Sequence, residues 1–201
     1  MQTLRAPTSS ARPSVARAPA ARVQPRVAAP RMQRAATVVV KAELKVGDKL
    51  DNYSDYFRVL KSSQGGTVTL SGFKGKQPVV LFFYPKAATP GCTKEACRFR
   101  DEFSRFTAAG AAVFGISSDS PEENAAFAKA NNLQFPLLTD QNALLRKAFG
   151  IKGDLMGLLP GRQTYVIDAN ARCVLSFNDQ FNVEAHVDEA LKALASSKIA
   201  A

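Results

Sequence analysis

The chain has 201 residues, which is enough for one domain whose core needs no disulfide scaffold. It contains no apolar run of the roughly 18 residues that a membrane span requires. Its three cysteines are an odd number, which argues against the disulfide framework of a small secreted domain. We therefore expect no membrane span, and thiols that are either used chemically or buried.

The formal net charge of +10 is concentrated in the first 41 residues. Seven arginines and Lys41 stand there without a single acidic residue, so this segment supplies eight of the ten net charges. An Arg-rich, acid-free stretch without an apolar h-region is typical of an organelle transit peptide and not of a secretory signal. We therefore predict a disordered transit peptide over residues 1–41 and a folded domain over residues 42–201.

A basic arm that binds nucleic acid is the alternative interpretation of residues 1–41. Five prolines would interrupt a continuous binding helix there. Lysine, which is common in such arms, does not occur before Lys41. We therefore expect no nucleic-acid partner.

The folded domain begins with a pattern of short strands. Residues 57–60 and 67–70 are expected to pair as a hairpin across the polar turn at residues 62–66. The segments 77–84 and 111–117 are almost entirely apolar, which is typical of strands that are buried on both faces of a sheet.

Helices are predicted after each of these apolar strands. Four apolar residues from Ala96 to Phe106 recur at helical spacing. Residues 120–123, Ser-Pro-Glu-Glu, have the Ser cap, the early Pro and the later Glu of a helix start, and that helix should run to about Asn131.

The rest of the chain continues the alternation of strands and helices. We predict a strand at residues 135–138, a short helix at 142–149, strands at 163–168 and 172–177, and a last helix with an apolar stripe from Val183 to Leu194. This order predicts an α/β layer fold with parallel strands at its centre and antiparallel hairpins at its edges. It is the plan of a thioredoxin-like fold, a central mixed sheet flanked by helices, although the pattern also permits a flavodoxin-like one.

Two cysteines, Cys92 and Cys97, stand where a loop passes into the first helix. Cys92 precedes Ala96 by four residues, so it shares the helix face that turns toward the sheet. Cys97 is rotated by about 140° from Cys92 and displaced by about 7.5 Å, which gives a Cα separation of about 8.6 Å. Because a disulfide allows no more than about 7 Å, the first turns of the helix would have to unfold if the two cysteines paired.

The position of Cys92 also favours the reactive thiolate. The free N–H groups of the first helical turn attract negative charge, and Arg162 at the start of a predicted central strand could add a guanidinium. Thr89 could aim its hydroxyl at the same point or simply cap the helix, and Pro85 would shield the pocket from water. The candidate catalytic residues are therefore Cys92, Cys97, Thr89, Arg162 and Pro85.

Other uses of the cysteines fit the sequence less well. A zinc site normally takes four Cys or His ligands, whereas this chain offers three cysteines and one histidine scattered along its length, so we expect no metal. A Cys-His hydrolase would need His186 near Cys92, but His186 stands between Glu184 and Asp188 and is predicted to be a solvated surface residue. The spacing of Cys92 and Cys97 also differs from the Cys-x-x-Cys motif of dithiol oxidoreductases.

These motifs resemble those of the peroxiredoxins, and specifically of the Q type, also called the bacterioferritin-comigratory type. The Pro-x3-Thr-x2-Cys signature of the family is present as Pro85, Thr89 and Cys92, and the second cysteine of the Q type is present as Cys97. The strand motif Arg-x-Ser/Thr-Phe/Tyr-x-Ile-Asp matches residues 162–168.

The resemblance covers residues 44 to about 197 and is strongest to plant and algal chloroplast members, so we expect the chloroplast, in the stroma or associated with the thylakoid, in preference to the mitochondrion. It implies a thioredoxin fold of the peroxiredoxin type, no metal or organic cofactor, and a thiol peroxidase that acts on hydrogen peroxide and alkyl hydroperoxides. By the same analogy Cys92 is the peroxidatic thiolate, and Thr89 and Arg162 orient the peroxide. Cys97 would then close an intramolecular disulfide that thioredoxin reduces. Because the resolving thiol is in the same chain, we expect a monomer.

Cys173 lies outside these motifs in a predicted strand, so we expect it to be buried and inert. The sequence leaves two other functions open. A disulfide exchanger would reduce protein disulfides without peroxide. A non-catalytic holdase or binding protein would keep its binding without Cys92 and Cys97 but lose it without residues 1–41.

Overall fold

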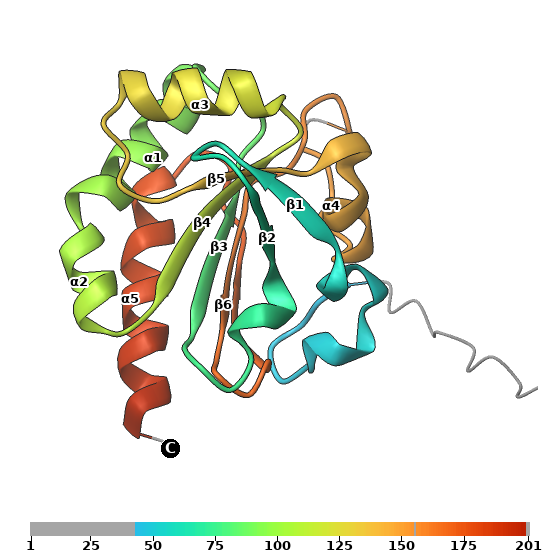
Figure 1. Ribbon diagram of the computed structural model, residues 1–201, viewed down its shortest axis with the longest axis vertical. Coiled ribbons are helices and arrows are strands. Elements are labelled where there is room, and N and C mark those ends of the chain that lie inside the picture. The colour runs from blue at the N-terminus through green and yellow to red at the C-terminus, as the bar shows by residue number, and fades with distance from the viewer. Residues whose placement is uncertain (1–42, 155, 200–201) are drawn as a thin grey trace, which may run out of the picture. The chain divides into compact units, whose positions relative to one another are not determined.

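The computed structural model describes residues 43–154 and 156–199, so the predicted transit peptide lies outside the described residues. A seven-stranded sheet forms the centre of the domain, in the order β2-β1-β5-β4-β3-β6-β7 (Figure 1). Its strands are β1 (Val59–Ser62), β2 (Thr67–Thr69), β3 (Val79–Phe83), β4 (Ala112–Ser117), β5 (Leu137–Thr139), β6 (Gln163–Ile167) and β7 (Cys173–Phe177).

The sheet is mixed. β4 pairs in parallel with both β3 and β5, whereas the other neighbouring strands pair antiparallel. The antiparallel pairing of β3 with β6 in the middle of the sheet differs from the all-parallel flavodoxin-like plan. The predicted thioredoxin-like fold, a central mixed sheet flanked by helices, is confirmed.

In the described residues, five α-helices and several short 3-10 helices surround the sheet. The α-helices are α1 (Pro90–Asp101), α2 (Phe103–Ala108), α3 (Pro121–Ala130), α4 (Leu144–Ala148) and α5 (Val183–Ile199). In Figure 1, α1, α2 and α5 lie together on one side of the sheet and α4 lies on the other. The 3-10 helices are η1 (Leu50–Asn52), η2 (Ser54–Phe57), η3 (Leu70–Phe73) and η4 (Gln141–Ala143).

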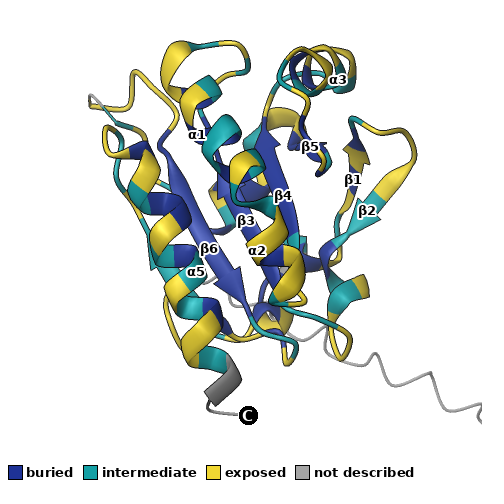
Figure 2. Ribbon diagram, turned by 90° about the vertical axis from the view of Figure 1, so that its left-hand side faces the viewer, coloured by how far each residue is buried: buried dark blue, intermediate teal, exposed yellow. Residues whose placement is uncertain are grey.

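The period of two along β3 divides the core between these two sides. Val80 and Phe82 belong to the hydrophobic cluster under α1, α2, α3 and α5, whereas Val79, Leu81 and Phe83 belong to the cluster under α4 and the N-terminal 3-10 helices. The central strands β3, β4 and β6 are almost fully buried (Figure 2). Residues at the ends of β3, β4 and β6 are therefore held in place by the buried centre of the sheet.

Some boundaries differ from the sequence prediction. The helix expected to continue through Phe106 breaks at Glu102, whose φ of −95° and ψ of 6° are not helical, and this break separates α1 from α2. The helix predicted at 142–149 starts only at Leu144, because Asn142 and Ala143 have positive φ angles of 60° and 53°. Neither break occurs at a Gly or Pro, so the sequence carries no signal for it.

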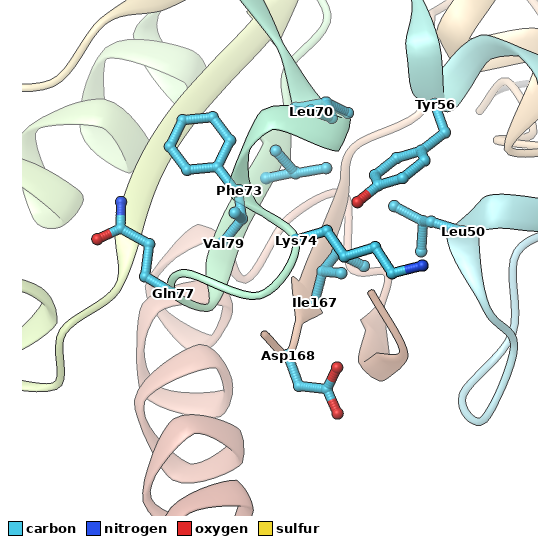
Figure 3. A pocket seen from close by; sticks show the side chains of 10 residues that line it. Leu50, Tyr56, Leu70, Phe73, Lys74, Gln77, Val79, Ile167 and Asp168 are labelled. Carbon is cyan, nitrogen blue, oxygen red and sulfur yellow. The ribbon is translucent and has the colours of Figure 1, made fainter. Parts of the chain in front are cut away.

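A small cavity of about 10 Å³ lies between β3, β6 and the N-terminal 3-10 helices (Figure 3). It is lined by Leu50, Tyr56 and Phe73 among others, and by the paired residues Val79 and Ile167. These two residues stand at the beginning of β3 and the end of β6, which is the end of the sheet far from the cysteine loop. The cavity has room for about one water molecule, so it is no substrate site.

Across residues 43–154 and 156–199, none of the helices combines the length and apolarity needed to cross a bilayer.

Candidate active site

Cys92 lies in the first turn of α1, in the segment that follows β3. Its side chain is 1% exposed and belongs to the same hydrophobic cluster as Tyr84, Ala96 and Phe99. This is the inward orientation predicted from its four-residue offset to Ala96. The thiol is thus screened from bulk water and lies beside the free N–H groups of a helix start, which favour an anion.

Arg162 reaches Cys92 from the start of β6. The antiparallel register pairs Phe83 with Gln163, so the residue that precedes β6 arrives at the end of β3. Arg162 is buried, and its Nη2 atom lies 3.5 Å from Cys92 Sγ. A Cβ atom on Gly91 would come within 3.3 Å of Nη2, so the glycine leaves room for this approach.

Glu95 completes a buried charge cluster that our sequence reasoning missed. Its carboxylate has no exposed surface and forms an ion pair with the Arg162 guanidinium. Burial raises the pKa of Glu95 to about 7, although Arg162 and Arg146 act in the opposite direction. The available signal was position, because Glu95 stands three residues after Cys92 and four before Phe99 on the buried face of α1.

Arg146, in α4, is a second missed residue. Its guanidinium donates to the carbonyl oxygens of Gly161 and, at 3.0 Å, of Tyr84, and it lies 5.5 Å from the centroid of the Phe83 ring. Burial lowers the pKa of Arg146. Because Tyr84 follows β3 and Gly161 precedes Arg162, this one side chain joins the two chain segments that form the site.

Cys97 lies on a different face of the same intact helix. It is half-buried, and its thiol donates to Asn131 Oδ1 at 3.6 Å, beyond the end of α3. Cys92, Cys97 and Cys173 are all free thiols in this structure. The two cysteines of the loop therefore face different neighbours, as the five-residue spacing predicts.

Thr89 and Pro85 lie in the loop between β3 and α1. Thr89 is the N-cap residue of α1, but its side chain makes no capping hydrogen bond, and its hydroxyl donates to the Lys86 carbonyl at 3.0 Å. The proton of that hydroxyl is thus directed at Lys86, and of the two roles that the sequence left open for Thr89 the side-chain cap is not formed. Pro85 is half-buried between Tyr84 and the loop.

Comparisons with known proteins agree with this geometry. The AhpC/TSA family matches residues 50–174. A chloroplastic peroxiredoxin Q from Sedum lineare is 54% identical over 139 residues, which cover 69% of this chain and 74% of the relative. The chain belongs to the peroxiredoxins. A second chloroplastic peroxiredoxin Q, from Populus jackii, is 53% identical over 68% of this chain, and 64% of its own length is matched.

Solved structures lead to the same family. Peroxidoxin BcpB from Mycobacterium tuberculosis has a TM-score of 0.67 and 38% identity, covering 77% of this chain and 98% of its own. A Xanthomonas campestris bacterioferritin comigratory protein, described for its alkyl peroxide reduction activity, has a TM-score of 0.66 and 28% identity, covering 78% and 99%. The prediction of a peroxidase-type oxidoreductase is thereby confirmed at the level of the family.

His186 is not the solvated residue that we predicted from its acidic neighbours. It is fully buried in the first turns of α5, where Nδ1 lies 2.7 Å from Thr164 Oγ1 and Nε2 lies 2.7 Å from the Asp179 carbonyl oxygen. Burial lowers its pKa to about 4. The prediction was wrong because helical spacing puts His186 on the face of Val183 and Ala190, whatever stands directly beside it in sequence.

The tautomer of His186 follows from its partners. Because a carbonyl oxygen can only accept, Nε2 carries the proton, and the Thr164 hydroxyl donates to Nδ1. The same Nδ1 lies 3.7 Å from Glu95 Oε1, an oxygen without a hydrogen-bond partner among the described residues. In this peroxiredoxin, Glu95 thus lies between the Arg162 guanidinium on one side and a neutral His186 on the other.

Cys173 is buried in β7, as predicted. Its thiol donates to the Leu175 carbonyl at 3.2 Å, and burial raises the pKa of Cys173 to about 12. The described residues contain no group of three or more His, Cys, Asp or Glu side chains placed to hold a metal ion.

Proposed function

We propose that this peroxiredoxin is a thioredoxin-dependent thiol peroxidase of the chloroplast that reduces hydrogen peroxide and alkyl hydroperoxides. The observation that carries the proposal is the 3.5 Å approach of Arg162 Nη2 to the buried Cys92 sulfur, in a helix that also bears Cys97. The names of the two plant relatives and the Arg-rich, acid-free start of the chain support the chloroplast.

In the first step the Cys92 thiolate attacks one peroxide oxygen and the O–O bond breaks. Cys92 becomes a sulfenic acid, and the departing oxygen takes up a proton and leaves as water or an alcohol. Arg162 stabilises the thiolate before the reaction and the charge on the departing oxygen during it. The Arg162 atom that lies beside the sulfur, and so beside the reacting peroxide, is Nη2.

Thr89 and Pro85 serve the same step. Because the Thr89 hydroxyl donates to Lys86, the lone pairs of Thr89 Oγ1 can accept the O–H of the incoming peroxide. Thr89 would thus orient the peroxide as an acceptor, while Arg162 orients it as a donor. The half-buried Pro85 limits the access of water.

In the second step the Cys97 sulfur attacks the Cys92 sulfenic acid, a disulfide forms and water leaves. The first turns of α1 must open for this, and the weak start of the helix supports such opening. Thr89 makes no capping hydrogen bond, whereas the start of α3 has a full capping box between Ser120 and Glu123. The Phe99 ring stacks on Phe82 at 4.3 Å and would limit how far the opening spreads.

Thioredoxin would complete the cycle by exchanging its dithiol for the Cys92–Cys97 disulfide, so that two thiols are restored here and one disulfide forms on the reductant. No second subunit has to supply a resolving thiol. We therefore propose that the functional unit is a monomer.

Mass spectrometry after one equivalent of peroxide tests the proposal most directly. We expect a Cys92–Cys97 disulfide, and peroxide-dependent turnover when a thioredoxin system is added. Cys92→Ser should abolish turnover, and the matched variant Cys173→Ser should keep it, because Cys173 lies in β7 away from the site. A Cys92–Cys173 bond, an intermolecular disulfide, or full turnover by Cys92→Ser would refute the assignment.

A further inference from the structure

Cys97 is tied to α3 through Asn131. The Cys97 thiol donates to Asn131 Oδ1 at 3.6 Å. The orientation of the Asn131 amide is fixed, because its Nδ2 atom donates to the Phe127 carbonyl oxygen at 2.9 Å and thereby leaves Oδ1 facing the sulfur. Asn131 thus holds the thiol in one direction, toward α3.

The main chain of Asn131 forms a second tie to the same part of α1. Arg100 Nη1 donates to the Asn131 carbonyl oxygen at 2.9 Å. The guanidinium is held in place by Asp101, which accepts from Arg100 Nε at 2.9 Å and Nη2 at 2.8 Å. The hydrogen bond with Asp101 first, and then Cys97, raise the pKa of Arg100, so the guanidinium stays charged. Asn131 therefore contacts both Cys97 and Arg100.

The Cys97–Asn131 contact exists only while α1 is folded. A disulfide between Cys92 and Cys97 brings their sulfur atoms to about 2.05 Å, which the two opposed positions on an intact helix forbid. The thiol must leave Asn131 before it can attack. The contact therefore stabilises the folded form of α1 relative to the open form in which Cys97 can react.

We propose that Asn131 is a positioning residue for Cys97, and that it sets how long the Cys92 sulfenic acid persists before the resolving thiol arrives. The proposal rests on the function proposed above for the two cysteines. A persistent sulfenic acid can react with a second peroxide, which transfers one oxygen to give the sulfinic acid and leaves as water or an alcohol. Asn131 thus governs the partition between disulfide and sulfinic acid.

The test uses Asn131→Ala, which removes the acceptor of the Cys97 thiol and keeps the main-chain carbonyl that Arg100 contacts. Full-length protein is exposed to rising hydrogen peroxide in the presence of a thioredoxin system, and mass spectrometry measures the fraction of Cys92 converted to sulfinic acid. We expect the variant to need about twofold to threefold more peroxide for half conversion, because the contact that is lost is a weak thiol hydrogen bond at the low end of the usual range. The peroxide concentration at half conversion does not depend on the rate of the first oxidation, because disulfide and sulfinic acid both form from the sulfenic acid.

Two control variants separate a role through Cys97 from general loosening of α1. Asp188→Asn removes the exposed ion pair with Arg98, another tie of α1 to its surroundings, and should leave the partition unchanged. In a Cys97→Ser background, Asn131→Ala should also have no effect on sulfinic acid formation, because no resolving thiol remains to be held.

The proposal is overturned if Asn131→Ala leaves the peroxide requirement unchanged or lowers it. It is also overturned if Asp188→Asn has an equal effect, or if the effect persists without Cys97. Failure of the proposed function has a different signature, because then no Cys92–Cys97 disulfide forms in the wild-type protein at any peroxide concentration.

Discussion

The two faces of α1 that carry cysteines are built in opposite ways. Cys92 faces a buried site in which Arg162 and Glu95 form an ion pair. Cys97 is half-buried and faces Asn131, with one weak thiol hydrogen bond. The buried face holds the Arg162 guanidinium beside Cys92 for the reaction with peroxide, whereas the outer face holds its thiol by a weak contact.

This contrast explains how one helix can serve two reactions. Breaking a buried ion pair costs about 3–5 kcal/mol when one partner is removed, whereas a typical net hydrogen bond contributes about 0.5–1.5 kcal/mol and a thiol is a weak donor. The rigid half therefore controls attack on the peroxide, and the weakly held half controls resolution.

The largest expected effect separates the two thiols. Cys92→Ser should lower the rate of peroxide consumption by at least about three orders of magnitude, because a serine hydroxyl does not ionise near neutral pH. Cys97→Ser should still consume one equivalent of peroxide rapidly and then fail to turn over with thioredoxin. Stopped-flow kinetics followed by steady-state assays distinguishes the two.

The kinetics of Cys97→Ser also test whether the two faces act separately. If Cys97→Ser also loses the first rapid equivalent, the outer face contributes to the peroxide reaction and the division of labour is wrong. Circular dichroism of each variant is the control for folding.

The next effect concerns the buried ion pair. Arg162→Gln should slow the oxidation of Cys92 by about 10²- to 10³-fold, because it removes the charge beside the thiolate. It should also lower the free energy of unfolding, by up to about 3–5 kcal/mol, because Glu95 loses its ion-pair partner and must either stay as an unpaired buried carboxylate or take up a proton. Chemical denaturation and single-turnover kinetics measure the two effects.

A second substitution sharpens this result. Glu95→Gln added to Arg162→Gln should restore much of the stability, because no buried charge is left unpaired, but it should not restore the rate. Recovery of both would mean that Arg162 acts on Cys92 only by supporting the fold.

The sequence allowed a good prediction of the sheet and of the inward orientation of Cys92. Continuous apolar runs identify β3 and β4, and the helical spacing from Cys92 to Phe99 identifies the inward face of α1. These are local patterns that tertiary structure had no reason to override. The motif positions also drew attention to Arg162 before its approach to Cys92 was visible.

The remaining residues of the site could not be predicted, because their roles depend on segments far apart in the chain. Arg146 bonds to the carbonyl of Tyr84, 62 positions away, and Asn131 contacts Cys97, 34 positions away. No local pattern marks either residue. His186 and Glu95 had a local signal in helical spacing, but polar residues on an apolar stripe are easily assigned to solvent.

The third prediction concerns the pH dependence of stability at the buried face. Burial raises the pKa of Glu95 from 4.5 to about 7, so its contribution to stability is present below pH 4.5 and lost as pH rises to 7. Burial lowers the pKa of His186 from 6.5 to about 4, so its contribution is present above pH 6.5 and lost as pH falls to 4. The two dependences oppose each other between about pH 4.5 and 6.5.

Single variants should separate the two opposing pH dependences of the free energy of unfolding. The wild-type unfolding free energy minus that of His186→Asn should rise with pH from about 4 to 6.5, by up to about 1.4 kcal/mol per pH unit. The wild-type value minus that of Glu95→Gln should fall with pH from about 4.5 to 7. Urea titrations across this range measure both, and flat differences would show that these groups titrate alike in the folded and unfolded chains.

The smallest expected effect lies at the exposed side of α1, where Arg98 pairs with Asp188 of α5 at 3.2 Å. The two side chains are 33% and 50% exposed, so solvent screens their attraction. Asp188→Asn should lower the free energy of unfolding by no more than about 0.5 kcal/mol, and 1 M salt should remove the difference. A loss above about 1.5 kcal/mol would mean that surface ion pairs hold α1 in place, and the contrast between its buried and outer faces would then not decide which half of the helix opens.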